Sequence, residues 1–151
     1  MRWSRSLRVA AVVLTALALV PAGAHVLALP NKIGLPQASC FIVQGICAGW
    51  WIGGLAWAAA LAANAAPALV LRHRGEPWGA AAMAAILLAL AFAVFFGFTE
   101  PANHATASWT DAAPDWKALR QRWEWSHATN AVVILAALAC TSRAATERGR
   151  D

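Results

Sequence analysis

Charged residues are scarce in this sequence of 151 residues. They make up 13% of the chain, about half of the roughly 25% that is usual in soluble globular domains. The low charge, the hydrophobic share of 60% and the mean hydropathy of +0.54 exclude an ordinary soluble protein and indicate a membrane protein. Tyrosine is absent, which excludes any mechanism that depends on a tyrosine phenol.

Cysteine is also rare, since the chain has only three. Cys40 and Cys47 lie seven residues apart, about 10.5 Å along a helix. This separation exceeds the roughly 7 Å between Cα atoms that a disulfide allows. We therefore expect both thiols, and that of Cys140, to be free and to serve packing.

Long apolar stretches fill most of the chain. We expect spanning helices over residues 9–29, 38–71, 78–99 and 117–142, because a helix needs roughly 20 apolar residues to cross a bilayer. The prediction is an all-α integral membrane four-helix bundle in the lipid bilayer, a single domain over residues 1–151. Pro30 is expected to end the first helix, and a long outer loop is expected between the third and fourth helices.

Arginines gather at alternate ends of these stretches, which predicts the topology. They are Arg2, Arg5 and Arg8 before the first stretch, Arg72 and Arg74 after the second, and Arg143, Arg148 and Arg150 after the fourth. The positive-inside rule places both termini in the cytoplasm, which predicts a multi-pass protein of the cell inner membrane. The net charge of +5 therefore reports topology and indicates no nucleic-acid partner.

The first stretch allows a second interpretation. Its arginines, the apolar run over residues 9–20 and the small residues 22–24 also fit a cleavable signal peptide. Cleavage there would remove residues 1–24 and leave the later topology unchanged.

Gly45, Gly49 and Gly53 recur every four residues in the expected second helix. On one helix face, this spacing lets another backbone approach closely. The neighbour is a helix of the same chain or of a second copy, so a homo-oligomer through these glycines is one alternative. The corresponding function is that of a non-catalytic membrane subunit or packing partner.

Polar side chains lie a few residues inside the outer ends of the stretches. His25, Gln44 and His127 each lie roughly 6 to 8 Å below the expected outer boundary, and Glu124 precedes His127 by three residues. Ionisable groups at this depth are costly in hydrocarbon and are by default candidates for function. We expect His127, Glu124 and His25 to be catalytic, with His127 as a general base whose basicity Glu124 raises.

These residues are expected to line an outward-facing pocket. Such a pocket suits a flat, apolar molecule with one or two hydrogen-bonding oxygens, because ligand sites are mostly apolar with a few convergent polar groups. Its expected ligand-binding residues are Gln44, Trp123, Arg120 and Asn103. The alternative is a purely structural polar layer in which Arg120 pairs with Glu124 and His25 bonds to Gln44 or a backbone carbonyl.

No cofactor is expected. Glu124 and His127 form only half of a di-metal carboxylate motif, whose other ligands the chain lacks. Two alternatives stay open, namely a single metal for which Glu100, His104 and His25 supply further ligands beside Glu124 and His127, and a haem between His25 and His127.

The segments that contain these outer-end residues also resemble those of a known protein family. They are His25, residues 30–36 (PNKIGLP), Val43–Gln44, Gly49–Trp50, residues 101–103, Trp109, residues 115–120 (DWKALR), residues 122–124 (RWE) and His127–Ala128. The chain resembles a bacterial family of small four-helix membrane proteins of unknown function that is distantly similar to the fungal anthrone oxygenases. The resemblance implies a bundle that binds or oxidises a polycyclic phenol or quinone-like compound without a cofactor. It adds Asn31 and Trp50 to the expected ligand-binding residues.

Overall fold

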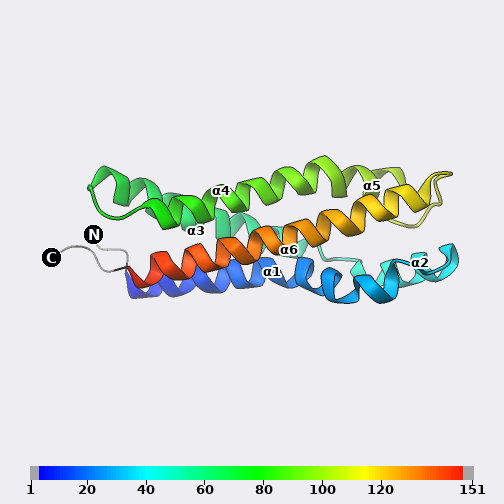
Figure 1. Ribbon diagram of the computed structural model, residues 1–151, viewed down its shortest axis with the longest axis horizontal. Coiled ribbons are helices and arrows are strands. Elements are labelled where there is room, and N and C mark those ends of the chain that lie inside the picture. Colours follow the sequence, from blue (N-terminus) through cyan, green and yellow to red (C-terminus); the bar gives the residue numbers. More distant parts are fainter. Residues whose placement is uncertain (1–3, 148–151) are drawn as a thin grey trace.

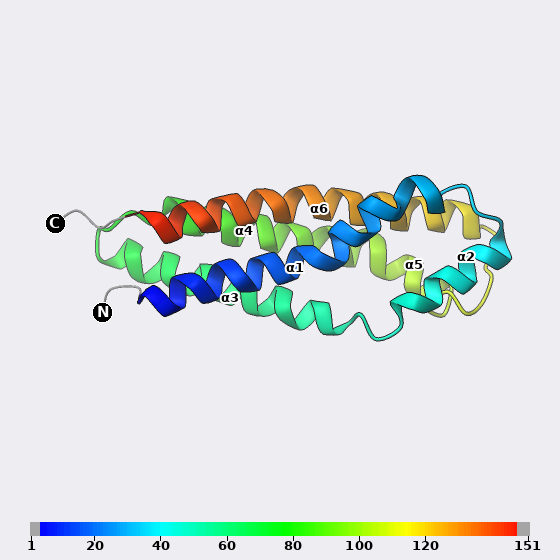
Figure 2. The same cartoon turned by 90° about the horizontal axis from the view of Figure 1, so that it is seen from below.

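The computed structural model describes residues 4–147, which form an elongated helical bundle without strands (Figure 1). The long helices are α1 (Arg5–Lys32), α3 (Ile52–His73), α4 (Gly79–Val94) and α6 (Trp116–Thr146). The beginning of α1, the end of α6 and the α3–α4 turn lie at one end, here called the terminal end (Figures 1 and 2). The short helices α2 (Gln37–Gln44) and α5 (Glu100–Ala105) lie at the other, here called the loop end.

Four stretches of helix are long and apolar enough to cross a membrane. They are Arg5–Lys32, Ile52–His73, Gly79–Ala105 and Trp116–Thr146. The predicted all-helical fold with four candidate spans is thus confirmed. Of the arginines that predict the topology, Arg2, Arg148 and Arg150 lie outside the described residues.

The four long helices form a closed ring of antiparallel neighbours. Helix α1 packs on α3 and α6, and α4 packs on the same two helices (Figure 2). Small side chains let the backbones approach closely, as is usual between helices in membranes. The central core contains Ala18, Ala22, Trp57, Ala60, Leu88, Ala91, Ala131, Ile134 and Ala137.

The expected single helix over residues 38–71 is wrong, because the chain breaks between α2 and α3. A short 3-10 turn (Gly45–Cys47) follows α2, and Gly49 then adopts φ +84°. Glycine takes this left-handed conformation without the clash that a Cβ would cause. The three spaced glycines therefore do not share one helix face, and only Gly53 makes a close approach, where an added Cβ would lie 2.8 Å from Cγ of Pro21.

Pro30 does not end the first helix, contrary to the prediction. Helix α1 continues past Pro30 to Lys32, because a proline in the last turn removes only one hydrogen bond of the ladder.

The third span continues through a π-helical turn (Phe95–Thr99) into α5. Pro101 has no N–H for the carbonyl of Gly97 four residues earlier, and Nη2 of Arg122 donates to that oxygen at 2.8 Å.

A second polar group, not predicted from the sequence, lies in the terminal half of the bundle. Nδ2 of Asn64 donates to Oγ1 of Thr15 at 3.3 Å, and Oγ1 of Thr141 donates to Oδ1 of Asn64 at 2.9 Å. The three side chains are fully buried and join α3, α1 and α6. Each of them also hydrogen-bonds to a backbone carbonyl of its own helix, so these buried side chains have partners.

Candidate functional site

A buried ion pair between α1 and α6 lies at the centre of the loop-end site. Nζ of Lys32 lies 3.0 Å from Oε1 of Glu124, and the side chains are 9% and 1% exposed. The same Nζ lies 3.0 Å from Nδ1 of His25, two helical turns earlier on α1. An ammonium group can only donate, so Nδ1 of His25 accepts and its ring proton lies on Nε2.

Two imidazoles and two indoles pack around this pair. The ring centroids of His25 and His127 lie 4.2 Å apart, and Trp123 lies 4.6 Å from His25 and 4.2 Å from His127. Trp50 covers His25 at 5.3 Å, and Nζ of Lys32 lies 5.1 Å from the centroid of Trp123. The structure therefore brings the two histidines to one level, as the depth count predicted.

His127 differs from His25 in its hydrogen bonding. Within residues 4–147 its ring nitrogens make no hydrogen bond, and its contacts are with the rings of His25 and Trp123. Glu124 binds Lys32 and not His127. The expected activation of His127 by Glu124 therefore has no direct contact to act through, and His127 is the imidazole of the cluster whose two ring nitrogens are both unpaired among the described residues.

Arg120 does not pair with Glu124 as the structural alternative expected. Its Nη1 donates to the backbone carbonyl of Leu35 at 3.0 Å, and the residue is 3% exposed. Lys32 takes the place of the arginine beside Glu124, because α1 extends far enough to bring its ammonium there. The guanidinium is left with one backbone acceptor.

Several buried polar atoms at the loop end have no partner among the described residues. They are Oε1 and Nε2 of Gln44, Nε and Nη2 of Arg120, and Oε2 of Glu124. Folded proteins pair the great majority of buried polar groups, since an unmade hydrogen bond costs about 1–3 kcal/mol. Gln44 also makes no bond to His25, which was the other structural alternative. These unpaired atoms are therefore candidates for contact with a polar ligand.

Asn103 positions the tryptophans of the site. Its Oδ1 accepts hydrogen bonds from Nε1 of Trp109 at 3.1 Å and from Nε1 of Trp123 at 2.8 Å. Trp109 reaches it from a turn in which Ala107, Ser108 and Trp109 have φ of +46°, +59° and +67°. Non-glycine residues adopt this left-handed conformation at a cost and tend to cluster at functional sites. Asn103 therefore acts on the expected pocket through the indoles.

The remaining expected ligand-binding residues lie at the edge of the cluster. Asn31 is exposed, and Trp50 is 38% exposed over His25. Lys32, the neighbour of Asn31, is the residue that the sequence analysis missed. The sequence signal for Lys32 was its position seven residues after His25. This spacing places both side chains on one helix face, provided that the helix continues past Pro30.

The cysteines are all free, as predicted. Burial raises the pKa of the Cys40 thiol, with a smaller opposing effect of the charge on Arg120. Burial likewise raises the pKa of the Cys47 thiol, against the opposing charge of Lys32. Both thiols stay protonated at neutral pH, so they line the cluster as small hydrophobic groups.

The two cofactor alternatives do not fit this geometry. No group of three His, Cys, Asp or Glu side chains in residues 4–147 could hold a metal ion, so Glu100, His104 and His25 form no site with Glu124 and His127. The imidazoles of His25 and His127 touch, with centroids 4.2 Å apart and planes 37° apart. This contact leaves no room for a porphyrin plane between them.

Comparisons with known proteins add no identity. No protein-family model matches the chain, and no curated protein or solved structure matches it. The likeness to the anthrone oxygenases therefore stays a prediction, and function is argued from the loop-end cluster.

Proposed function

We propose that the loop-end cluster binds a flat, apolar molecule with an acidic or carbonyl oxygen, such as a polycyclic phenol or a quinone-like compound. The observation that carries this proposal is an excess of buried positive charge. Lys32 and Arg120 face one buried carboxylate, that of Glu124, and two nitrogens of Arg120 lack an acceptor. A ligand oxygen with negative charge would supply that acceptor.

The aromatic side chains support the shape of this ligand. Trp123 and Trp50 lie beside the two imidazoles, and aromatic walls bury flat rings with favourable stacking and edge contacts. The unpartnered amide of Gln44 can both donate and accept a hydrogen bond. Apolar walls with a few polar groups are typical of small-molecule sites.

The reaction we propose is a cofactor-free oxygenation. His127 takes a proton from a CH2 group conjugated with the ligand carbonyl, and the electron pair delocalises onto the carbonyl oxygen, where the charges of Lys32 and Arg120 stabilise it. Molecular oxygen forms a bond to that carbon and takes the proton back as a hydroperoxide. Loss of the second C–H proton with cleavage of the O–O bond releases water. The CH2 group and O2 thus become a carbonyl and one water molecule.

The setting we propose is the inner membrane, with both termini in the cytoplasm. The four apolar spans support insertion, and the described arginines at the terminal end, namely Arg5, Arg8, Arg72, Arg74 and Arg143, support the orientation. The loop-end cluster would then lie just below the outer surface, where an apolar ligand can enter from the bilayer.

The test uses anthrone as the probe and compares His127→Ala with His73→Ala. His73 ends α3 at the terminal end, so this control makes the same substitution away from the cluster. In lipid nanodiscs the wild-type protein and His73→Ala should consume one O2 per anthraquinone formed, and His127→Ala should lose about 100-fold or more in rate. Quenching of tryptophan fluorescence measures anthrone binding separately.

Folding of the variants decides between the site and a structural polar layer. Circular dichroism and size-exclusion chromatography without ligand should show that His127→Ala keeps its helices. An equal rate in folded His127→Ala would overturn the base assignment, and failure of the wild-type protein to bind anthrone would overturn the ligand class. Loss of folding in His127→Ala before anthrone is added would instead support the structural layer.

A further inference from the structure

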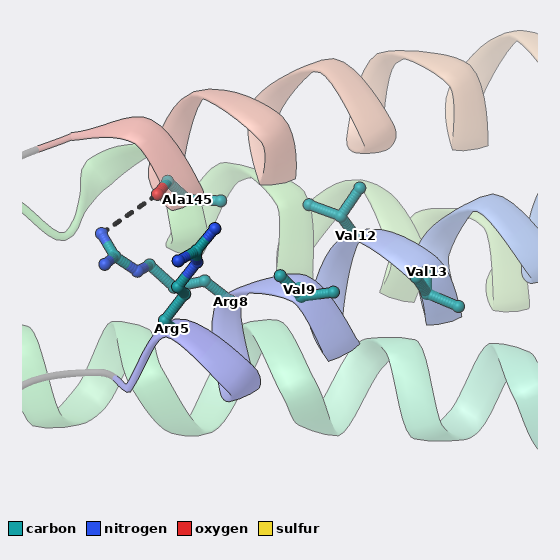
Figure 3. A pocket seen from close by; sticks show the side chains of 6 residues that line it. All are labelled: Arg5, Arg8, Val9, Val12, Val13 and Ala145. Carbon is teal, nitrogen blue, oxygen red and sulfur yellow. Dashed lines mark hydrogen bonds between the residues drawn. The ribbon is translucent and has the colours of Figure 1, made fainter.

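A pocket lies at the terminal end, between the beginning of α1 and the end of α6 (Figure 3). Its volume is about 380 Å³, and it is lined by Arg5, Arg8, Val9, Val12, Val13 and Ala145. The two arginines gather at one side of it, and the valines continue along α1 (Figure 3). The pocket therefore has a cationic part and an apolar part.

The positive charges of the cationic part have few partners within the described protein. Nη1 of Arg8 donates to the carbonyl of Ala145 at 3.2 Å, and among the described residues neither Arg5 nor Arg8 forms an ion pair. Glu147, the acidic residue just past α6, is bound by Arg143 at 3.0 Å. A guanidinium presents several N–H groups in a plane that matches the oxygens of a phosphate.

The apolar part continues as a stripe on α1 away from the arginines. Val9, Val13 and Leu17 recur every four residues and are 56%, 50% and 50% exposed. The stripe is about 12 Å long, enough to lie along much of an acyl chain. A ligand that fills both parts is an amphiphile with an anionic head and an apolar tail.

We propose that this pocket binds one anionic phospholipid of the surrounding bilayer, with its phosphate on Arg5 and Arg8 and an acyl chain along the valine stripe. The proposal depends on the proposed membrane insertion and is separate from the loop-end site. Basic pockets between helices at the cytoplasmic side of membrane proteins have the chemistry that holds such headgroups. The bound lipid would also join the ends of α1 and α6.

The test is native mass spectrometry of protein released from nanodiscs of equal phosphatidylglycerol and phosphatidylcholine. The wild-type protein should retain phosphatidylglycerol in excess. Arg5→Gln/Arg8→Gln should reduce this retention about fivefold for each guanidinium removed. Arg72→Gln/Arg143→Gln is the matched control, because it removes the same charge at the same end from residues that do not line the pocket.

Three outcomes would overturn the proposal. They are equal retention of the two lipids by the wild-type protein, equal losses in the two double variants, and displacement of phosphatidylglycerol by millimolar inorganic phosphate, which would make free phosphate the ligand. Val12→Phe keeps the charge and fills the pocket, so it should also lower retention. This variant keeps the test informative where loss of the Arg8 bond to Ala145 impairs folding.

Discussion

Replacement of Lys32 by methionine tests the buried ion pair on which the loop-end site depends. At 3.0 Å and an effective dielectric constant near 20, the attraction between Nζ of Lys32 and Oε1 of Glu124 is about 5.5 kcal/mol. Desolvation of both charges offsets most of this attraction. The variant removes the cation that is in direct contact with the buried Glu124 carboxylate, so we expect it to lower the free energy of unfolding by about 3–5 kcal/mol.

Two comparisons make this prediction specific. The double variant Lys32→Met/Glu124→Gln removes both charges and should recover most of the loss, because replacing a whole buried pair is often nearly neutral. Glu147→Gln breaks the Arg143–Glu147 pair, which has the same 3.0 Å separation but side chains 75% and 28% exposed. This exposed pair should contribute less than about 1 kcal/mol.

The measurement is reversible unfolding in mixed detergent micelles, followed by far-ultraviolet circular dichroism. A loss in Lys32→Met no larger than that in Glu147→Gln would refute the burial of the pair. A double variant as unstable as the sum of the two single variants would refute the coupling between Lys32 and Glu124.

Two further predictions concern packing and pH. Gly53→Ala should destabilise the protein by about 1–2 kcal/mol because its Cβ would meet Cγ of Pro21 at 2.8 Å. Gly54→Ala is the control, because a Cβ added at Gly54 would meet no atom within 4 Å, and it should be neutral or stabilising. Equal melting temperatures of the two variants would contradict the α1–α3 contact. Because burial raises the pKa of the Cys40 thiol, the alkylation rate of Cys40 should rise with pH at a higher midpoint than the roughly 8.5 of an ordinary thiol. The stability that this pKa shift contributes is present below the ordinary thiol pKa and is lost as pH rises through the raised pKa. An alkylation midpoint at or below about 8.5 would contradict the burial of Cys40.

The helices were largely predictable, and their interruptions were not. A span needs a long apolar run whatever its neighbours are, so four candidate spans could be read from composition along the chain. The break at Gly49 depends on one backbone dihedral angle, and the passage of α1 through Pro30 depends on where the last turn of the helix falls. An apolar sequence pattern reports neither.

The candidate site divides in the same way. The rise per residue of a helix is constant, so counting alone placed His25 and His127 at one depth. The local spacing of four residues predicted Arg120 as the partner of Glu124. In the structure the partner is Lys32, because α1 and α6 are neighbours and α1 extends far enough to bring the ammonium group there.

The sequence by itself determined the all-helical class of the fold, the approximate bounds of most candidate spans and the common level of His25 and His127, because apolar length and helical rise are local properties. Only the tertiary structure decided which polar groups meet and which stay unpaired. Hydrogen bonds and ion pairs between helices require side chains from distant parts of the chain to approach within about 3 Å, and helix packing sets that approach.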